Sequence, residues 1–183
     1  MKLAILDRDG VLNEDSEDYI KGPDEWRPIP GSLEAVARLN RAGYRVVVVT
    51  NQSALARGLL DNDALTAIHI RMHRELANVG GVVEASFFCP HAPDAECACR
   101  KPKPGLLHEI ARRLGTSLEG VPMVGDSLRD LQAAAEAGAT PVLVRTGNGA
   151  RTATAPGLPA GLAVFADLAS FVDAHLKTAG AEA

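Results

Sequence analysis

The stretch Leu3-Ala4-Ile5-Leu6-Asp7-Arg8-Asp9-Gly10-Val11 joins a short apolar run to two carboxylates and a glycine. A short run of large apolar residues that ends at polar residues is typical of a buried strand. Similar runs recur at residues 45–49, 82–88, 121–124 and 141–144. The sequence therefore predicts five buried strands, and the first of them ends directly before Asp7.

Amphipathic helical patterns alternate with these strands. In four segments, apolar residues recur at spacings that place them on one face of a helix. These residues are Leu33, Val36 and Leu39; Leu107, Ile110, Ala111 and Leu114; Leu128, Leu131 and Ala135; and Leu168, Phe171 and Val172. The alternation predicts an α/β fold with right-handed crossovers, in which helices cover both faces of an open, doubly wound, mostly parallel sheet.

The length and composition limit the kind of protein this can be. The chain has 183 residues, of which 46% are hydrophobic and 23% charged, and these proportions exclude a disordered or fibrous chain. The formal net charge of −4 gives no general attraction for nucleic acid or for an anionic membrane. The apolar run before Asp7 is too short for a signal peptide or a membrane span. We expect a cytoplasmic monomer, with one domain over residues 1–178 and a flexible tail over 179–183.

Residues with reactive or metal-binding side chains follow the predicted strands. Asp7, Thr50 and Cys89 come directly after the first three strands, and Asp126 follows the fourth with one glycine between. The carboxyl ends of parallel strands meet at one edge of the sheet, and open α/β folds bind their ligands there. We therefore expect these four side chains to lie along one edge.

The pair Asp7 and Asp9 suggests a metal site. Two neighbouring carboxylates are not both comfortably ionised without a cation, so a divalent metal or a shared proton is expected. Asp126 would supply a third oxygen ligand, and Asp130, one helical turn later, could hold a metal-bound water. Helix capping would explain Asp126 alone, but it does not explain Asp7 and Asp9 together.

Two further segments offer groups that could bind a phosphoryl oxygen. Residues Thr50-Asn51-Gln52-Ser53 provide hydroxyl, amide and backbone donors at the end of a strand. Lys101 precedes a predicted helix and offers a fixed cation to the same edge. A carboxylate nucleophile, a second acid, metal ligands, a hydroxyl and a lysine are together the parts that phosphoryl transfer needs.

Two segments are too long for plain connections between a strand and a helix. We interpret residues 13–30 as a flap over the site, in which Tyr19 and Trp26 either shield the site from water or pack the loop. Residues 89–104 contain Cys89, His91, Cys97 and Cys99, which are the ligand types and number of a closed structural Zn²⁺ site. Such a zinc would fix the positions of Arg100 and Lys101. The alternative is three reduced thiols on a surface loop.

The motifs in chain order resemble those of the haloacid dehalogenase-like hydrolases: Asp7-x-Asp9, then Thr50, Lys101 and Gly125-Asp126-x-x-x-Asp130. The resemblance covers most of the chain. It implies a Rossmann-like fold without a large cap, bound Mg²⁺ and a phosphoaspartyl intermediate.

The same resemblance implies a role for each matching residue. Asp7 would be the nucleophile and Asp9 the general acid/base, while Thr50 and Lys101 bind the phosphoryl group. Asp126 would bind Mg²⁺ with Asp7, and Asp9 is counted with this metal-binding set. Val11 stands where the family often has Thr, so one possible hydroxyl contact is absent.

The cysteine loop with Arg100-Lys101-Pro102 is similar to one branch of this family, the D-glycero-D-manno-heptose 1,7-bisphosphate phosphatases. That similarity implies a small sugar bisphosphate as substrate, hydrolysed at the primary 7-phosphate in heptose biosynthesis for the lipopolysaccharide core or a related nucleotide. The implied substrate contacts are Asp15, Tyr19, Asn51, Gln52, Ser53 and Arg100. Arg57 could provide a further cation for the second phosphate. The branch often has Lys directly after the fourth-motif Asp, where this chain has Ser127.

Other interpretations stay open at this point. The adjacent branch, the histidinol-phosphate phosphatases, shares the zinc loop, and the flap acids Glu14, Asp15, Glu17 and Asp18 could form the acidic wall that its amine substrate needs. Gly125-Asp126-Ser127-Leu128 also matches a serine esterase block, with Asp173 and His175 as partners. A zinc-stapled binding module would leave Asp7, Asp9 and Lys101 unexplained.

His69 and His73 are best explained as a solvated helix face, and residues 146–161 as a mobile segment.

Overall fold

The computed structural model describes residues 1–181 and contains one sheet of six parallel strands. The strand order is β3-β2-β1-β4-β5-β6. The strands are β1 (Lys2–Leu6), β2 (Tyr44–Asn51), β3 (Ala85–Cys89), β4 (Pro122–Gly125), β5 (Thr140–Val144) and β6 (Ala163–Phe165). The predicted doubly wound, parallel α/β fold is confirmed.

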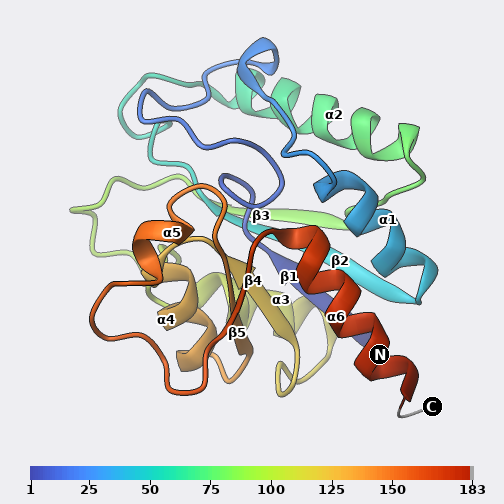
Figure 1. The fold of residues 1–183 in the computed structure, drawn as a ribbon. Helices are drawn as coiled ribbons and strands as arrows, with labels where there is room; N and C mark the ends of the chain where they lie inside the picture. Colours follow the sequence, from blue (N-terminus) through green and yellow to red (C-terminus); the bar gives the residue numbers. More distant parts are fainter. Residues whose placement is uncertain (182–183) are drawn as a thin grey trace.

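Helices cover both faces of the sheet (Figure 1). The helices are α1 (Ser32–Arg41), α2 (Asn62–Asn78), α3 (Gly105–Leu114), α4 (Leu128–Glu136), α5 (Gly149–Thr152) and α6 (Leu168–Ala181), with a 3-10 turn at Pro23–Glu25. Alternate residues of each central strand face opposite ways. Val46 and Val48 pack in the same core as α1, α2 and α6, whereas Val47 and Val49 pack in the core that contains α3 and α4.

The strand order reverses beside β1, and this feature places the site. β1 pairs with β2 on one side and with β4 on the other. The backbone N–H of Asp7 donates to the carbonyl of Val124 at 2.8 Å, so the ends of β1 and β4 are held together. The two loops that follow these strands therefore start next to each other at the switch point of the sheet.

Several sequence-based expectations about elements need correction. The strand β6 was not predicted, because Ala163-Val164-Phe165 is short and two of its three residues are exposed. Ala135 is exposed, and α4 instead turns Leu131, Ala133 and Ala134 inward. Residues 179–181 belong to α6 rather than to a separate tail, and residues 182–183 lie outside the described part of the chain. Within residues 1–181, no helix combines the length and apolarity needed to cross a membrane.

Candidate active site

Three buried carboxylates meet at the ends of β1 and β4. Asp7 follows β1, Asp126 follows β4, and Asp130 lies in the first turn of α4. Each offers a carboxylate oxygen within 4.8 Å of the others, and all three residues are buried. The side chain of Asp9, two residues after Asp7, is not part of this group. The strand ends therefore create a compact anionic site, as the chain order of the motifs predicts.

Lys101 is the counter-charge inside this site. Its Nζ lies 2.9 Å from Asp7 Oδ1 and 2.7 Å from Asp130 Oδ1, and it donates to the carbonyl of Val49 at 2.9 Å. Asn51 fixes the backbone of this lysine, because its side-chain amide accepts from Lys101 N and donates to Lys101 O, both at 3.1 Å. The ammonium group is thus buried and held at a defined point.

The charges in the site are unbalanced. Burial raises the pKa of Asp7 well above its usual range, and repulsion from Asp130 raises it further. Burial and the same neighbour raise the pKa of Asp126 to about 6. Burial would also raise the pKa of Asp130, but the ion pair with Lys101 outweighs burial and lowers this pKa. One lysine faces three acids, so the site favours an additional cation.

Two glycines allow the backbone to approach Asp126 closely. A Cβ atom at Gly10 would lie 2.2 Å from Asp126 Oδ2, and one at Gly147 would lie 2.3 Å from the same atom. The backbone N–H of Asn148 donates to Asp126 Oδ2 at 2.7 Å, and the hydroxyl of Thr146 donates to the Gly10 carbonyl at 2.6 Å. The interpretation of the whole of residues 146–161 as a mobile segment is therefore wrong at its start, because residues 146–148 are bonded into the site. The small polar residues of this segment gave no indication in the sequence that they contact the site.

Asp9 lies beside the carboxylate group and has contacts of its own. Its carboxylate accepts hydrogen bonds from Arg8, Asn13 and Gln52. Gln52 also donates to Thr50 Oγ1 at 2.9 Å, so these side chains are linked across the ends of β1 and β2. The amide of Gln52 thus connects the two residues that the family resemblance assigns to proton transfer and phosphoryl binding.

These groups open into one pocket of about 310 Å³. All six residues expected to contact the substrate line it, together with the carboxylates Asp7, Asp9 and Asp126 and the donors Thr50 and Lys101. The lining also includes Ser16, Glu17, Ile20, Pro93 and Arg129. Arg129 was not expected at the site from the sequence. The one feature of the sequence that could have indicated it is its position near the start of α4. Arg57 is absent from this lining, and its guanidinium lies 6.0 Å from the centre of the Tyr19 ring.

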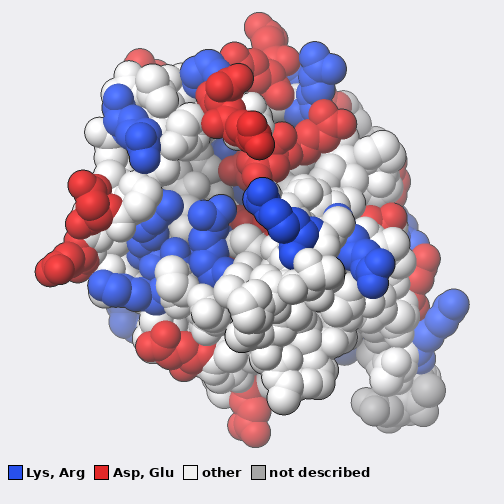
Figure 2. Space-filling view, turned by 60° about the vertical axis from the view of Figure 1, so that its left-hand side comes forward, with Lys and Arg blue, Asp and Glu red and all other residues white. Residues whose placement is uncertain are grey.

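The pocket lies between an acidic and a basic surface. Figure 2 shows acidic side chains gathered beside a group of lysines and arginines on the face that carries the strand ends. Asp15 and Glu17 of the flap line one part of the pocket, and Arg100 and Arg129 line another. Arg100 Nη1 donates to the carbonyl of His91 at 3.3 Å, so the cysteine loop helps to place this guanidinium.

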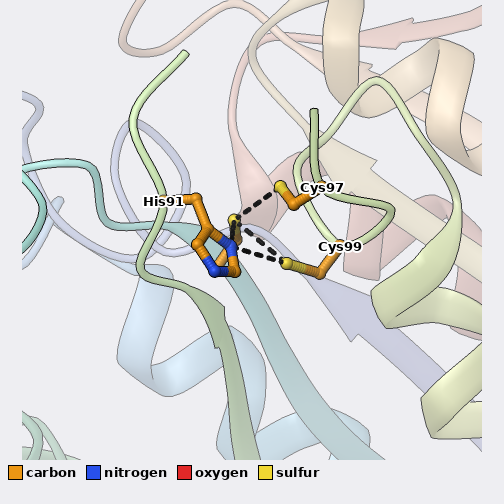
Figure 3. A group of neighbouring side chains, drawn as sticks. His91, Cys97 and Cys99 are labelled. Atoms are coloured by element: carbon orange, nitrogen blue, oxygen red, sulfur yellow. Dashed lines mark hydrogen bonds between the residues drawn. The ribbon is translucent and has the colours of Figure 1, made fainter. Parts of the chain in front are cut away.

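The cysteine loop brings its four expected ligands together. Figure 3 shows His91, Cys97 and Cys99 pointing toward a common centre. Cys89 Sγ lies 3.5 Å from His91 Nδ1, 3.7 Å from Cys97 Sγ and 3.2 Å from Cys99 Sγ. Tetrahedral zinc with bonds of about 2.0–2.3 Å separates its ligand atoms by about 3.3–3.8 Å. The cluster therefore has the donor types and the approximate spacing of a structural zinc site.

The residues of the esterase interpretation are not brought together. Ser127 donates to Asp130 in a capping box at the start of α4. His175 instead packs against the rings of Tyr44 and Phe171, and Asp173 pairs with Arg38. Each proposed member of the triad thus has other partners, and this alternative is wrong.

Two smaller expectations about aromatic and histidine residues are also resolved. Trp26 is fully buried in the core with α1 and α2, so it packs the flap rather than shielding the site. His73 is exposed as expected, but His69 is partly buried, and its ring lies 6.4 Å from that of Phe88. Burial lowers the pKa of His69 to about 4, so a solvated face describes only His73.

Comparison with known proteins adds relatives that share this architecture. The family model of haloacid dehalogenase-like hydrolases matches residues 1–138. D-glycero-beta-D-manno-heptose-1,7-bisphosphate 7-phosphatase from Bordetella bronchiseptica is 60% identical over 179 residues, which cover 98% of this chain and 100% of that protein. The Pseudomonas aeruginosa protein of the same name is 53% identical over 175 residues, covering 96% and 98% of the two chains.

A solved structure is also very similar. The crystal structure of D,D-heptose 1,7-bisphosphate phosphatase from B. bronchiseptica, complexed with magnesium and phosphate, has a TM-score of 0.96 and 60% identity. The match covers 97% of this chain and 99% of that one. The fold, the family model and these relatives agree with one another, and so the chain belongs to the haloacid dehalogenase-like hydrolases.

Proposed function

We propose that this chain is a Mg²⁺-dependent phosphatase that removes the 7-phosphate of D-glycero-D-manno-heptose 1,7-bisphosphate. The observation that carries the proposal is the cluster of three buried carboxylates, Asp7, Asp126 and Asp130, with Lys101 paired to Asp7 where the cluster meets the pocket. The names of the relatives support the choice of substrate.

The carboxylate group fits a divalent cation. Its oxygens are within 4.8 Å of one another, and Lys101 alone does not balance their charge. Oxygen donors of this kind suit Mg²⁺. Asp7 and Asp126 would hold the ion, because both line the pocket, whereas Asp130 does not and is bonded to Lys101 and Ser127. When bound, Mg²⁺ would neutralise negative charge on the phosphoryl oxygens.

The side chains then divide the reaction between them. A carboxylate oxygen of Asp7 attacks phosphorus, and the bond between phosphorus and the sugar oxygen breaks as Asp9 donates a proton to that oxygen. In the second step a water gives its proton to Asp9 and attacks the aspartyl phosphate, releasing inorganic phosphate and free Asp7. Lys101 and Thr50 hold the transferred group during both steps.

The cysteine cluster would hold a structural Zn²⁺ through Cys89, His91, Cys97 and Cys99. Four protein ligands leave no open position on a tetrahedral ion, so this site would shape the loop rather than take part in the chemistry. The support is the spacing of the four donors and the contact between His91 and Arg100.

The remote phosphate of the substrate would bind between Arg100 and Arg129. Both residues line the pocket together with Lys101, and among the described residues they are the two arginines of that lining. Arg129 thus offers the charge that the branch often places at position 127. Asn51, Gln52, Ser53, Asp15 and Tyr19 would contact the sugar.

Histidinol phosphate is the second candidate substrate, because Asp15 and Glu17 also line the pocket and could pair with its amine. The deciding experiment compares kcat/KM for the two esters with Mg²⁺ present. We expect the heptose bisphosphate to be preferred, and Arg100→Ala and Arg129→Ala each to weaken its turnover more than that of p-nitrophenyl phosphate. A preference for histidinol phosphate would overturn the substrate assignment and leave the phosphatase assignment intact.

A further inference from the structure

Arg8, the residue between the two motif aspartates, is almost fully buried beside the active site. It is 1% exposed, and its ion pair is with Asp9, at 3.0 Å. A guanidinium is expensive to bury, so a paired arginine at such a place calls for an explanation. The proposed mechanism gives no role to this residue.

The forked guanidinium of Arg8 donates two hydrogen bonds to the Asp9 carboxylate, one to each oxygen. Its Nε donates to Asp9 Oδ1 and its Nη2 to Asp9 Oδ2, each at 3.0 Å. Two parallel hydrogen bonds from a planar guanidinium fix the orientation of a carboxylate as well as its position. A lysine, which is a point charge, would not fix the orientation in this way.

Two amides complete the set of donors. Asn13 Nδ2 donates to Asp9 Oδ1 at 2.9 Å, and Gln52 Nε2 donates to Asp9 Oδ2 at 2.9 Å. Each carboxylate oxygen therefore accepts two hydrogen bonds, which uses the roughly four acceptor positions that a carboxylate has. For Asp9 to carry a proton and to pass it to a substrate oxygen, one of these donors has to give way.

All three donors are buried, but only one of them lines the pocket, and this indicates which donor gives way. Asn13 is fully buried and Arg8 nearly so, and neither lines the pocket, whereas Gln52 does. The leaving oxygen therefore approaches Oδ2 from the Gln52 side, while Arg8 and Asn13 hold the carboxylate from behind.

We propose that Arg8 is a positioning residue for the acid/base Asp9: its fork keeps the carboxylate aimed at the leaving oxygen of the substrate. This inference rests on the proposed phosphatase function and deepens it. Arg8 itself does not contact the reacting atoms. Its effect should therefore be largest for esters whose leaving group needs a proton, because proton donation is the step that Asp9 performs.

Two generic esters of similar size test this idea. Benzyl phosphate releases an alkoxide that must be protonated, whereas p-nitrophenyl phosphate releases a stable anion that needs no proton. The measured quantity is kcat/KM, because it reports steps up to phosphoryl transfer and not the later hydrolysis of the intermediate. Arg8→Met should lower the value for benzyl phosphate on the order of 10- to 100-fold, a part of the 10²–10⁴-fold typical of general acid catalysis, and change that for p-nitrophenyl phosphate by less than about threefold.

Further variants separate positioning from folding. Arg8→Lys keeps the charge without the fork and should show the same selective loss, at a smaller size. Arg38→Met removes an arginine that pairs with Asp173 between α1 and α6, and should leave both values unchanged. If Arg8→Met does not fold, Asn13→Leu removes one donor to Asp9 and should give the same selectivity.

The outcomes distinguish this inference from the proposed function. An equal loss for both esters in a folded Arg8 variant, or wild-type behaviour of Arg8→Lys, would overturn the role of the fork. Failure of the wild-type protein to hydrolyse either ester with Mg²⁺ would instead overturn the phosphatase function, and this inference with it.

Discussion

At the residue scale, Asp7 is placed to be the nucleophile, because it both contacts Lys101 and lines the pocket. Asp7→Asn keeps the shape of the side chain but removes its charge and nucleophilic oxygen. We expect phosphate release to fall by at least about 10³-fold, as for other nucleophile deletions. Thermal unfolding should show a fold at least as stable as wild type, since burial raises the pKa of Asp7 and the neutral amide avoids that cost. A folded variant with near-normal activity would contradict the assignment.

The close approach of Gly147 to Asp126 leads to a second prediction at this scale. A Cβ atom there would lie 2.3 Å from Asp126 Oδ2, whereas at Gly157, which also has a positive φ, it would meet nothing within 4 Å. Gly147→Ala should therefore weaken Mg²⁺ binding at least tenfold, taking about 1.4 kcal/mol as the cost of a modest shift of Asp126. Gly157→Ala should show only the backbone cost of about 1–2 kcal/mol in unfolding free energy. Titration of both variants with Mg²⁺ separates the two effects, and equal affinities would show that Gly147 has no role at the site.

Residues next to strand ends could be predicted because their position follows from local sequence. Asp7, Thr50 and Asp126 each stand at or directly after an apolar run, and parallel strands bring such residues to one edge. Arg129 and Asn148 could not be found in this way. Arg129 lines the pocket and Asn148 bonds to Asp126, and they are brought there by the path of α4 and of the loop after β5, which depends on the tertiary packing of the whole domain.

At the scale of elements, the cysteine loop is expected to depend on zinc while the sheet does not. The loop connects β3 to α3, and both of these elements are anchored in the core beneath it. Cys97→Ser should lose bound zinc and most phosphatase activity, because Arg100 and Lys101 follow directly in the chain. The free energy of unfolding should change by much less than the roughly 10–16 kcal/mol that zinc contributes in isolated finger peptides.

Two measurements check this prediction. Metal analysis of protein purified under reducing conditions should find one zinc per wild-type chain, and the absence of zinc would contradict it. Far-ultraviolet circular dichroism of Cys97→Ser should remain close to that of wild type. As a matched control, Ser86→Ala changes a residue in β3 whose hydroxyl has no hydrogen-bond partner in the described structure, and it should keep both zinc and activity.

The elements themselves differ in how well they could be predicted. The central strands β1, β2, β4 and β5 show in the sequence as nearly continuous apolar runs, because both faces of a central parallel sheet are covered. The run at residues 82–88 includes Glu84 and Ser86, and the strand there, β3, is a largely half-buried edge strand rather than the buried one expected. The edge strand β6 lacks this signal since its first two residues are exposed. The flap gave an ambiguous signal, because an aromatic such as Trp26 serves equally well in a core or over a site until its neighbours are known.

At the scale of the whole molecule, the buried acids link stability to pH and to Mg²⁺. The folded-state pKa of Asp126 is about 6, above the ordinary value of 3.8. Between these values the folded chain binds more protons than the unfolded chain, so stability is fully present below about pH 4 and is lost as pH rises through 6. The loss from this group is on the order of 2–3 kcal/mol in the metal-free protein. The raised pKa of Asp7 acts in the same direction.

Mg²⁺ should reverse this loss, because it binds the ionised carboxylates and not the protonated ones. We therefore expect the rise in melting temperature on adding Mg²⁺ to be small at pH 5 and larger at pH 7.5. Asp126→Asn removes the titrating group and should abolish most of this difference. The control Asp173→Asn changes an acid of α6 that pairs with Arg38 of α1, and it should preserve the difference. If Mg²⁺ raises the melting temperature equally at both pH values, the ion does not bind through the carboxylates of Asp7 and Asp126. The excess negative charge of these buried acids would then not be what binds the metal.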